Sequence, residues 1–230
     1  MIALPSGGLE GGDLCALFSC GGQRAARIVL ADCVGHGFTA ASLAQHVHRL
    51  LHTFRDVRDT AGLLAALNDE FTLSGQTPGA PLRLTTVVTA TYDGTTGEFN
   101  FAYAAHPRML LHREGQARWQ PLGEGLEGLP LGFISGEIYN QQSIRLLPGD
   151  MVLAFSDAVT EVESPAGEQL TPEGFLELAG KTLAAFGQPP ALGEFAAALV
   201  DGIRRYHGAE EFDDDLTLLT LRRSSQVPDL

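Results

Sequence analysis

The sequence predicts an α+β fold built on antiparallel sheets. Short runs rich in β-branched and aromatic residues cluster as hairpins, and the segments expected to be helical come in two pairs. The regular alternation of strand and helix that is typical of a parallel sheet is missing. At 230 residues and 44% hydrophobic content, the chain can bury one sizeable core. We therefore expect one domain over residues 1–223 and a disordered polar tail over 224–230.

The strands are predicted from their patterning and from the turns between them. The runs DLCALFSC and RAARIVLAD flank the turn GGQ and should pair as an antiparallel hairpin. A second hairpin around DGTTG is predicted by the alternation in LTTVVTATYDGTTGEFNFAYAAH. Further strands are expected at RMLLHR, ARWQPL, NQQSIRLL, MVLAF and LTLLTL.

Four segments are expected to be helices. From Thr39 onward, and over about residues 172–186 and 191–206, apolar side chains recur at the three- and four-residue steps of an amphipathic helix. A further helix is expected at about 60–72, so that each pair of helices follows a group of strands.

Charge and cysteine content exclude several classes of protein. A net charge of −13 would repel nucleic acid and anionic membranes, and no localised basic patch offsets it. Three cysteines without zinc-ligand spacing argue against a disulfide framework and favour a reducing compartment, so we expect a cytoplasmic protein. No signal-peptide pattern is visible, and no apolar run reaches the roughly 18 residues of a membrane span.

Acidic residues stand at the ends of four predicted strands. They are Asp13, Asp32, Asp157 and the triplet at 213–215. If these ends converge, the carboxylates crowd into one cleft, where repulsion raises their pKa values unless cations neutralise them. An all-oxygen ligand set favours Mg²⁺, Mn²⁺ or Ca²⁺ over zinc. Two such ions bridging a water would lower its pKa for attack on a phosphorus atom.

Each of these placements also has an ordinary structural explanation. Aspartate commonly occupies turns and the N-caps of helices, and a run of acidic residues such as that at 213–215 is usually a solvated loop. The hypothesis of a metal site therefore depends on the four placements together.

Six segments carry a family resemblance over about residues 10–222. In order they are EGGD, LADCVGHGFTAAS, FAYAAHPRMLLHREG, LPLG, LLPGDMVLAFSDAVTEVESPAGEQL and FDDDLTLLTLR. Together they resemble the metal-dependent, protein phosphatase 2C-like serine/threonine phosphatases, in the bacterial branch that includes sporulation stage II protein E and phosphatases regulating sigma-factor antagonists. The resemblance implies a four-layer α-β-β-α sandwich of two antiparallel sheets flanked by helix pairs, with a dinuclear Mn²⁺ or Mg²⁺ site.

The resemblance also implies roles for the residues of LADCVGHGFTAAS and EGGD. Asp32 resembles the ligand shared by both metals, while the backbone carbonyl of Cys33 and the carboxylate of Asp13 resemble ligands of one of them. In the eukaryotic branch a histidine two positions after the bridging aspartate can act as a general acid, but that position is Val34 here. His36 fits a hydrogen-bonding residue near the site better, with catalytic proton transfer beside Asp32 as the alternative.

The second metal is assigned by the same resemblance. Asp157 and Asp214 resemble its ligands, with Asp215 as the alternative to Asp214. All four principal aspartates are present, which favours activity over an inactive scaffold.

Three alanines depart from the family's pattern. Ala16 replaces a frequent second acid, and Ala105 and Ala158 replace glycines. Because glycine adopts positive φ angles more easily than alanine, a backbone shift at these two turns is expected to be possible. His106, which follows Ala105, fits a structural residue at the edge of a hairpin.

These observations favour a cytoplasmic phosphatase that uses two Mn²⁺ or Mg²⁺ ions to activate water for attack on a phosphoserine or phosphothreonine. By family analogy, its phosphorylated protein substrate would be an anti-sigma-factor antagonist. One alternative is a non-catalytic, phosphatase-like binding module, which the alanine departures would favour. Another is a metal-dependent hydrolase of a different phosphate ester, since a fold does not determine its substrate. We expect no nucleic-acid or membrane partner, and the oligomeric state is left open.

Overall fold

The strands of the protein form two five-stranded antiparallel sheets. The computed structural model describes residues 1–4, 11–20, 25–35, 37–75 and 83–224. The chain divides into two compact units, each with one of the sheets. The first unit comprises Met1–Leu9, Arg108–Leu122 and Leu147–Leu230, and the second Glu10–Pro107 and Gly123–Leu146.

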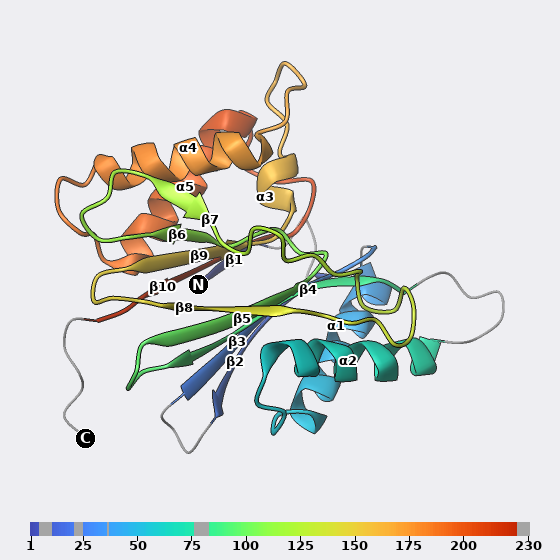
Figure 1. Cartoon of the computed structure of the whole chain (residues 1–230). Coiled ribbons are helices and arrows are strands. Elements are labelled where there is room, and N and C mark those ends of the chain that lie inside the picture. Colours follow the sequence, from blue (N-terminus) through green and yellow to red (C-terminus); the bar gives the residue numbers. More distant parts are fainter. Residues whose placement is uncertain (5–10, 21–24, 36, 76–82, 225–230) are drawn as a thin grey trace. The chain divides into compact units, whose positions relative to one another are not determined.

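The first unit contains the sheet β1-β10-β9-β6-β7 and three helices (Figure 1). Its strands are β1 (Ile2–Leu4), β6 (Leu110–His112), β7 (Trp119–Pro121), β9 (Met151–Phe155) and β10 (Leu216–Arg222). Its helices are α3 (Ala158–Glu161), α4 (Thr171–Ala184) and α5 (Leu192–His207). Helices α4 and α5 contact each other and the sheet, and their apolar stripes bury Phe175, Phe195 and Leu199 in the core of this unit.

The second unit contains the sheet β2-β3-β4-β5-β8, with α1 and α2 on one of its faces (Figure 1). Its strands are β2 (Asp13–Cys20), β3 (Ala25–Cys33), β4 (Thr85–Asp93), β5 (Glu98–Ala104) and β8 (Gln141–Arg145). Its helices are α1 (Gly37–Thr53) and α2 (Thr60–Gly75). Val47 of α1 and Leu63 and Leu67 of α2 are fully buried in a core with Val29 of β3.

A buried arginine ties the connection between α1 and α2 to the sheet. Arg27 on β3 is 2% exposed, and its guanidinium donates hydrogen bonds to the backbone carbonyls of Arg55, Val57 and Arg58. The planar fork of donors can satisfy several carbonyls at once, so one strand residue orients this connection.

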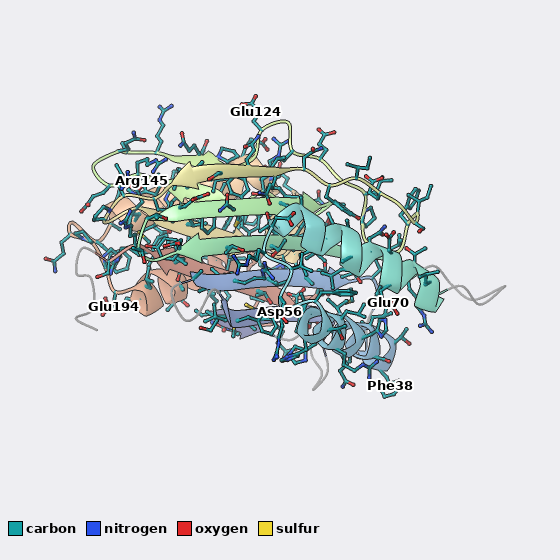
Figure 2. The ribbon with its side chains drawn as sticks, turned by 60° about the horizontal axis from the view of Figure 1, so that its bottom comes forward. Phe38, Asp56, Glu70, Glu124, Arg145 and Glu194 are labelled. Atoms are coloured by element: carbon teal, nitrogen blue, oxygen red, sulfur yellow. The ribbon has the colours of Figure 1, made fainter. Side chains whose placement is uncertain are left out.

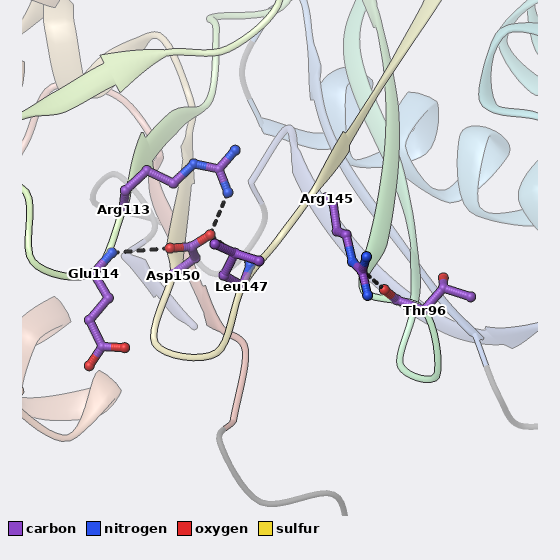
Figure 3. Close-up of polar contacts among 6 residues, drawn as sticks. All are labelled: Thr96, Arg113, Glu114, Arg145, Leu147 and Asp150. Atoms are coloured by element: carbon purple, nitrogen blue, oxygen red, sulfur yellow. Dashed lines mark hydrogen bonds and ion pairs between the residues drawn. The ribbon is translucent and has the colours of Figure 1, made fainter.

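The hairpin predicted around DGTTG is confirmed. Asp93 accepts hydrogen bonds from the amides of Thr95 and Thr96 at 2.7 and 3.0 Å, which lower the pKa of its carboxyl. On β8, Arg145 Nε donates to the carbonyl of Thr96 at 3.1 Å (Figure 3). The turn is thus held by a side chain within it and by one from the neighbouring strand.

The turn that leads into β9 is organised by Asp150. Its side chain is only 2% exposed and accepts hydrogen bonds from Arg113 Nη1 and from the amides of Glu114 and Leu147, at 3.0 and 2.7 Å for the amides (Figure 3). A buried carboxylate needs such partners because it has lost its water shell. This arrangement connects β6 to the start of β9.

Most predicted elements are confirmed, and two short ones were missed. The predicted hairpin 13–32 and the four predicted helices correspond to β2–β3, α1, α2, α4 and α5. β1 and α3 have three and four residues, too few to show a periodicity. The GGQ turn and residues 225–230 of the predicted tail lie outside the described residues, and the single domain over 1–223 stays a prediction. Across the described ranges, no helix is long and apolar enough to cross a membrane.

Replacing Asp150 by Ala is expected to lower the free energy of unfolding by about 3 kcal/mol, because Arg113 and two amides lose a buried acceptor. Urea unfolding measures the change. The control is Asp56→Ala, at an exposed position in the α1–α2 connection (Figure 2), which should change stability by less than about 0.5 kcal/mol. Equal effects at the two positions would contradict this role of Asp150.

Candidate functional site

Asp13 and Asp32 are direct cross-strand neighbours. The register of β2 and β3 pairs them, and the next pair along the strands is Leu14 with Ala31. Leu14 and Ala31 pack into the core beneath α1 and α2, so strand alternation turns the two carboxylates to the opposite face of the sheet. Opposed residues in such a ladder have Cβ atoms about 4.5–5.5 Å apart, and like charges there are destabilising. The fold therefore holds two carboxylates together where repulsion requires compensation.

The carbonyl of Cys33 lies against the glycine that precedes Asp13. The amide of Cys33 donates to the carbonyl of Gly12 at 3.3 Å, and a Cβ on Gly12 would come within 2.8 Å of the Cys33 carbonyl oxygen and 3.2 Å of Ala40 Cβ. Only glycine allows this approach without a shift of the backbone. The second glycine of EGGD thus sets the local backbone around Asp13 and Cys33.

The thiol of Cys33 belongs to the core. It is 1% exposed in the cluster beneath α1 and accepts a hydrogen bond from Thr85 Oγ1 at 3.5 Å. Burial raises the pKa of the thiol to about 12, and the charges of Asp32 and Asp13 also raise it. The thiol therefore stays protonated, and only the carbonyl of this residue is suited to bind a cation.

The row of polar side chains continues onto β4. Asp32 is paired with Thr86, and Thr86 Oγ1 shares a hydrogen bond of 2.8 Å with His106 Nδ1. His106 lies just beyond β5. His106 lies near Asp13 and Asp32 because β2 pairs with β3 and β3 pairs with β4. A sequence pattern could identify the histidine but could not predict that it lies near these aspartates.

Of the two alanines that replace family glycines, one adopts a glycine-like conformation. Ala105 has φ 54°, in the left-handed region that favours glycine. Ala158 instead begins α3 as an ordinary helical residue. The positive φ angle expected at a glycine position is therefore found at Ala105, next to His106, and not at Ala158. Ala16 is buried in the core beneath the helices, on the face of β2 opposite to that of Asp13.

In the first unit, Ser156 joins the end of β9 to the acidic triplet. Its amide donates to the Thr217 carbonyl at 3.1 Å, and its Oγ accepts from the Thr217 amide at 2.9 Å. The same hydroxyl donates to the backbone carbonyl of Asp215 at 3.2 Å. These bonds hold Asp157, the next residue, near the segment that enters β10.

Asp157 does not cap the helix that follows it. Its backbone carbonyl accepts from the amides of Thr160 and Glu161, but its side chain makes no capping hydrogen bond to α3. The explanation of this aspartate as a helix cap therefore fails.

Glu161 completes an acidic group in the first unit. Burial raises the pKa of its carboxyl, and the charges of Asp157 and Asp214 raise it further, so the three carboxylates interact electrostatically. Asp214 Oδ1 itself accepts the amide of Asp215 at 2.7 Å. Sequence reasoning missed Glu161, although its spacing of four from Asp157 would have identified it once a helix was expected there.

The predicted ligands fall into two groups. Asp13, Asp32 and Cys33 belong to the second unit, whereas Asp157, Asp214 and Asp215 belong to the first. In neither unit do three described His, Cys, Asp or Glu side chains form a cluster that could hold a metal ion by themselves. His36, the candidate for proton transfer, lies outside the described residues.

The family Stage II sporulation protein E (SpoIIE) matches residues 22–224 of this chain. The chain belongs to the SpoIIE family. The match includes β3, with Asp32 and Cys33, and the segments that carry Asp157 and Asp214.

Solved structures show the same fold. The structure of the RsbU and RsbW domains of a Mycobacterium tuberculosis protein is 27% identical in sequence to this SpoIIE-family chain, with a TM-score of 0.74. The match covers 96% of the present chain and 58% of the M. tuberculosis chain. The SiaA PP2C domain of Pseudomonas aeruginosa is 21% identical, covering 96% and 85%, with a TM-score of 0.78. RsbX in complex with magnesium is 14% identical, covering 95% and 91%, with a TM-score of 0.64. The predicted α+β fold class with two antiparallel sheets is confirmed.

Replacing Gly12 by Ala is expected to lower the free energy of unfolding by about 1–3 kcal/mol, because the new Cβ would meet a backbone oxygen that cannot move freely. The control is Gly193→Ala in the first turn of α5, where a Cβ meets nothing within 4 Å. Denaturant unfolding should show a loss only for Gly12→Ala; no difference between the two variants would disprove the close approach.

The two alanine positions predict opposite responses to glycine. Ala105→Gly should raise the free energy of unfolding by about 0.5–1 kcal/mol, because it removes a strained left-handed alanine. Ala158→Gly should lower it by about 1 kcal/mol, because glycine is a poor helix former. Thermal and urea unfolding measure both changes, and the same sign in the two variants would refute the assigned conformations.

Proposed function

We propose that this protein is a metal-dependent phosphoprotein phosphatase that acts on phosphoserine or phosphothreonine. The observation that carries the proposal is the cross-strand pairing of Asp13 with Asp32 in a chain of the SpoIIE family. Like charges directly opposite each other in a sheet are destabilising, and a cation bound between them would compensate them. A divalent cation fits this need.

The donor set supports Mn²⁺ or Mg²⁺. Asp13, Asp32 and the carbonyl of Cys33 would hold one ion, and all three donors are the hard oxygens that these ions prefer. The thiol of Cys33 is buried and protonated, so this residue offers only its carbonyl oxygen. A pair of such ions supplies an activated water for attack on phosphorus.

Asp157 and Asp214 are proposed as the ligands of the second ion. The absence of a capping bond leaves the Asp157 carboxylate for this role, and both residues raise the pKa of Glu161. Asp214 is favoured over Asp215 because its charge, together with that of Asp157, acts on Glu161.

The remaining residues position this machinery. The hydrogen bond between Thr86 and His106 would orient the row of side chains beside Asp32, and Ser156 would keep Asp157 near Asp214. His36 stays a candidate for proton transfer next to Asp32.

The proposed substrate is a phosphorylated regulatory protein of the anti-sigma-factor-antagonist class, in the cytoplasm. Membership of the SpoIIE family supports this choice, as does the similarity to a chain with RsbU and RsbW domains. The present chain spans 58% of the length of that relative. The activity and partners of the whole protein are therefore proposed here.

The test measures phosphate release from phosphoserine and phosphothreonine peptides and from p-nitrophenyl phosphate, with Mn²⁺, with Mg²⁺ and with a chelator. We expect metal-stimulated hydrolysis that Asp32→Asn and Asp157→Asn reduce at least about 100-fold, equal to about 2.7 kcal/mol of transition-state stabilisation. Asp214→Asn should lower activity more than Asp215→Asn, and Asp56→Asn should leave it unchanged.

Thermal unfolding with Mn²⁺ provides a readout independent of activity, because an ion that binds only the folded state raises the melting temperature. The rise should be largest for the unchanged protein and smaller for Asp32→Asn. Folded protein with no metal-stimulated hydrolysis would overturn the proposal. Faster hydrolysis of small esters than of any phosphoprotein would instead indicate a different phosphate-ester hydrolase.

A further inference from the structure

The first unit contains a cavity of about 770 Å³ at the ends of β9 and β10 that lie away from the acidic residues. It touches Met151 on β9 and Arg222 on β10. Met151 precedes Asp157 by six residues, about 20 Å of extended strand, so the cavity is separate from the proposed metal ligands. Its volume is in the range of small-molecule sites, roughly 300–1,000 Å³.

The lining combines an apolar wall with a positive rim. Leu183 of α4 and Leu192 of α5 contribute to the wall, and Arg222 and Arg223 contribute to the rim. The Nη1 group of Arg222 donates a hydrogen bond to the carbonyl of Pro190 at 2.8 Å. This bond holds the arginine side chain near the N-terminus of α5.

Among the described residues of the lining, Glu114 is the one acidic residue, and its side chain extends away from Asp150 (Figure 3). Two arginines against one glutamate give the described lining residues a net charge of one positive unit. This sign is opposite to that of the whole chain, whose net charge is −13. An anionic group would therefore be attracted to this cavity although the protein as a whole repels anions.

A glycine keeps space open in the wall. Gly180 lies inside α4 and lines the cavity, and a Cβ built on it meets nothing within 4 Å. Glycine inside a helix lowers stability by roughly 0.5–1 kcal/mol relative to alanine. At Gly202 of α5, by contrast, a Cβ would come within 2.9 Å of Leu178. Packing explains Gly202, whereas no atom of the described residues lies within 4 Å of a Cβ on Gly180.

We propose that this cavity binds a small amphipathic anion, a carboxylate head on an apolar body of medium length. The apolar wall would accept the hydrocarbon body, and the rim of Arg222 and Arg223 would bind the carboxylate by charge-assisted hydrogen bonds. The open volume at Gly180 accommodates part of the ligand.

Trp119 packs against a residue of the cavity lining and can report ligand binding by its fluorescence. Trp119 is the single tryptophan of the chain and is 3% exposed. Its ring centre is 5.2 Å from that of His112, which lines the cavity, and it is stacked on Phe195 at 5.7 Å. A ligand that contacts His112 should change the emission of Trp119.

The experiment titrates the full chain with octanoate, octanol and octylammonium and follows Trp119 emission. These probes share a hydrocarbon body and differ in head-group charge. We expect saturable binding of octanoate at least about tenfold tighter than that of octylammonium, a difference of about 1.4 kcal/mol. Equal affinities for the three probes, or no binding of octanoate, would overturn the proposal.

Two variants of Gly180 and one double arginine variant separate binding in the cavity from non-specific binding. Gly180→Leu should fill the space and abolish octanoate binding, whereas Gly180→Ala should retain binding and stabilise α4. The double variant Arg222→Gln/Arg223→Gln should weaken octanoate about tenfold and leave octanol unchanged. Unchanged octanoate binding in Gly180→Leu would refute the assigned cavity.

A chain ending at Ser224 tests whether residues 225–230 occupy the cavity instead. Octanoate binding that is the same with and without these residues supports the proposal. If their removal shifts Trp119 emission and octanoate adds no further change, the cavity belongs to the chain's own terminus and the proposal is wrong.

Discussion

The central constraint is the register of β2 and β3, which places Asp13 directly opposite Asp32. The register is enforced on the other face, where Leu14 and Ala31 must meet the core beneath α1 and α2. A slip of one residue would expose this apolar set and bury the carboxylates. Hydrophobic packing on one face therefore keeps two carboxylates opposite each other on the other face.

In the first unit, hydrogen bonds of Ser156 fix the positions of the segments that carry the acidic residues. Ser156 joins the end of β9 to Thr217 and to the carbonyl of Asp215, which restrains the segment just before β10. The backbone carbonyl of Asp157 accepts the first amide hydrogen bonds of α3, and its carboxylate makes no capping hydrogen bond. In the first unit, neutral backbone and hydroxyl contacts thus fix the end of β9 against the start of β10.

Glycine and alanine positions distinguish conformational need from family pattern. Ala105 keeps the left-handed backbone although its side chain disfavours it, while Ala158 fits a helix without strain. Gly12 is required by the nearby carbonyl of Cys33, whereas in the described part of the chain a Cβ on Gly180 would meet no atom within 4 Å. The same residue type is therefore present for different structural reasons at different positions. Only the atoms around each position distinguish these reasons.

The local pattern of the sequence was sufficient for the hairpins, the four longer helices and the candidate aspartates, because alternation, helical periodicity and turn residues act over a few neighbours. β1 and α3 were missed because such short elements depend on the partners they pack against. Glu161 was missed together with α3. The tertiary structure alone decided that Asp13 faces Asp32 and that His106 reaches Thr86, because strand register is a contact between distant segments that no local pattern encodes.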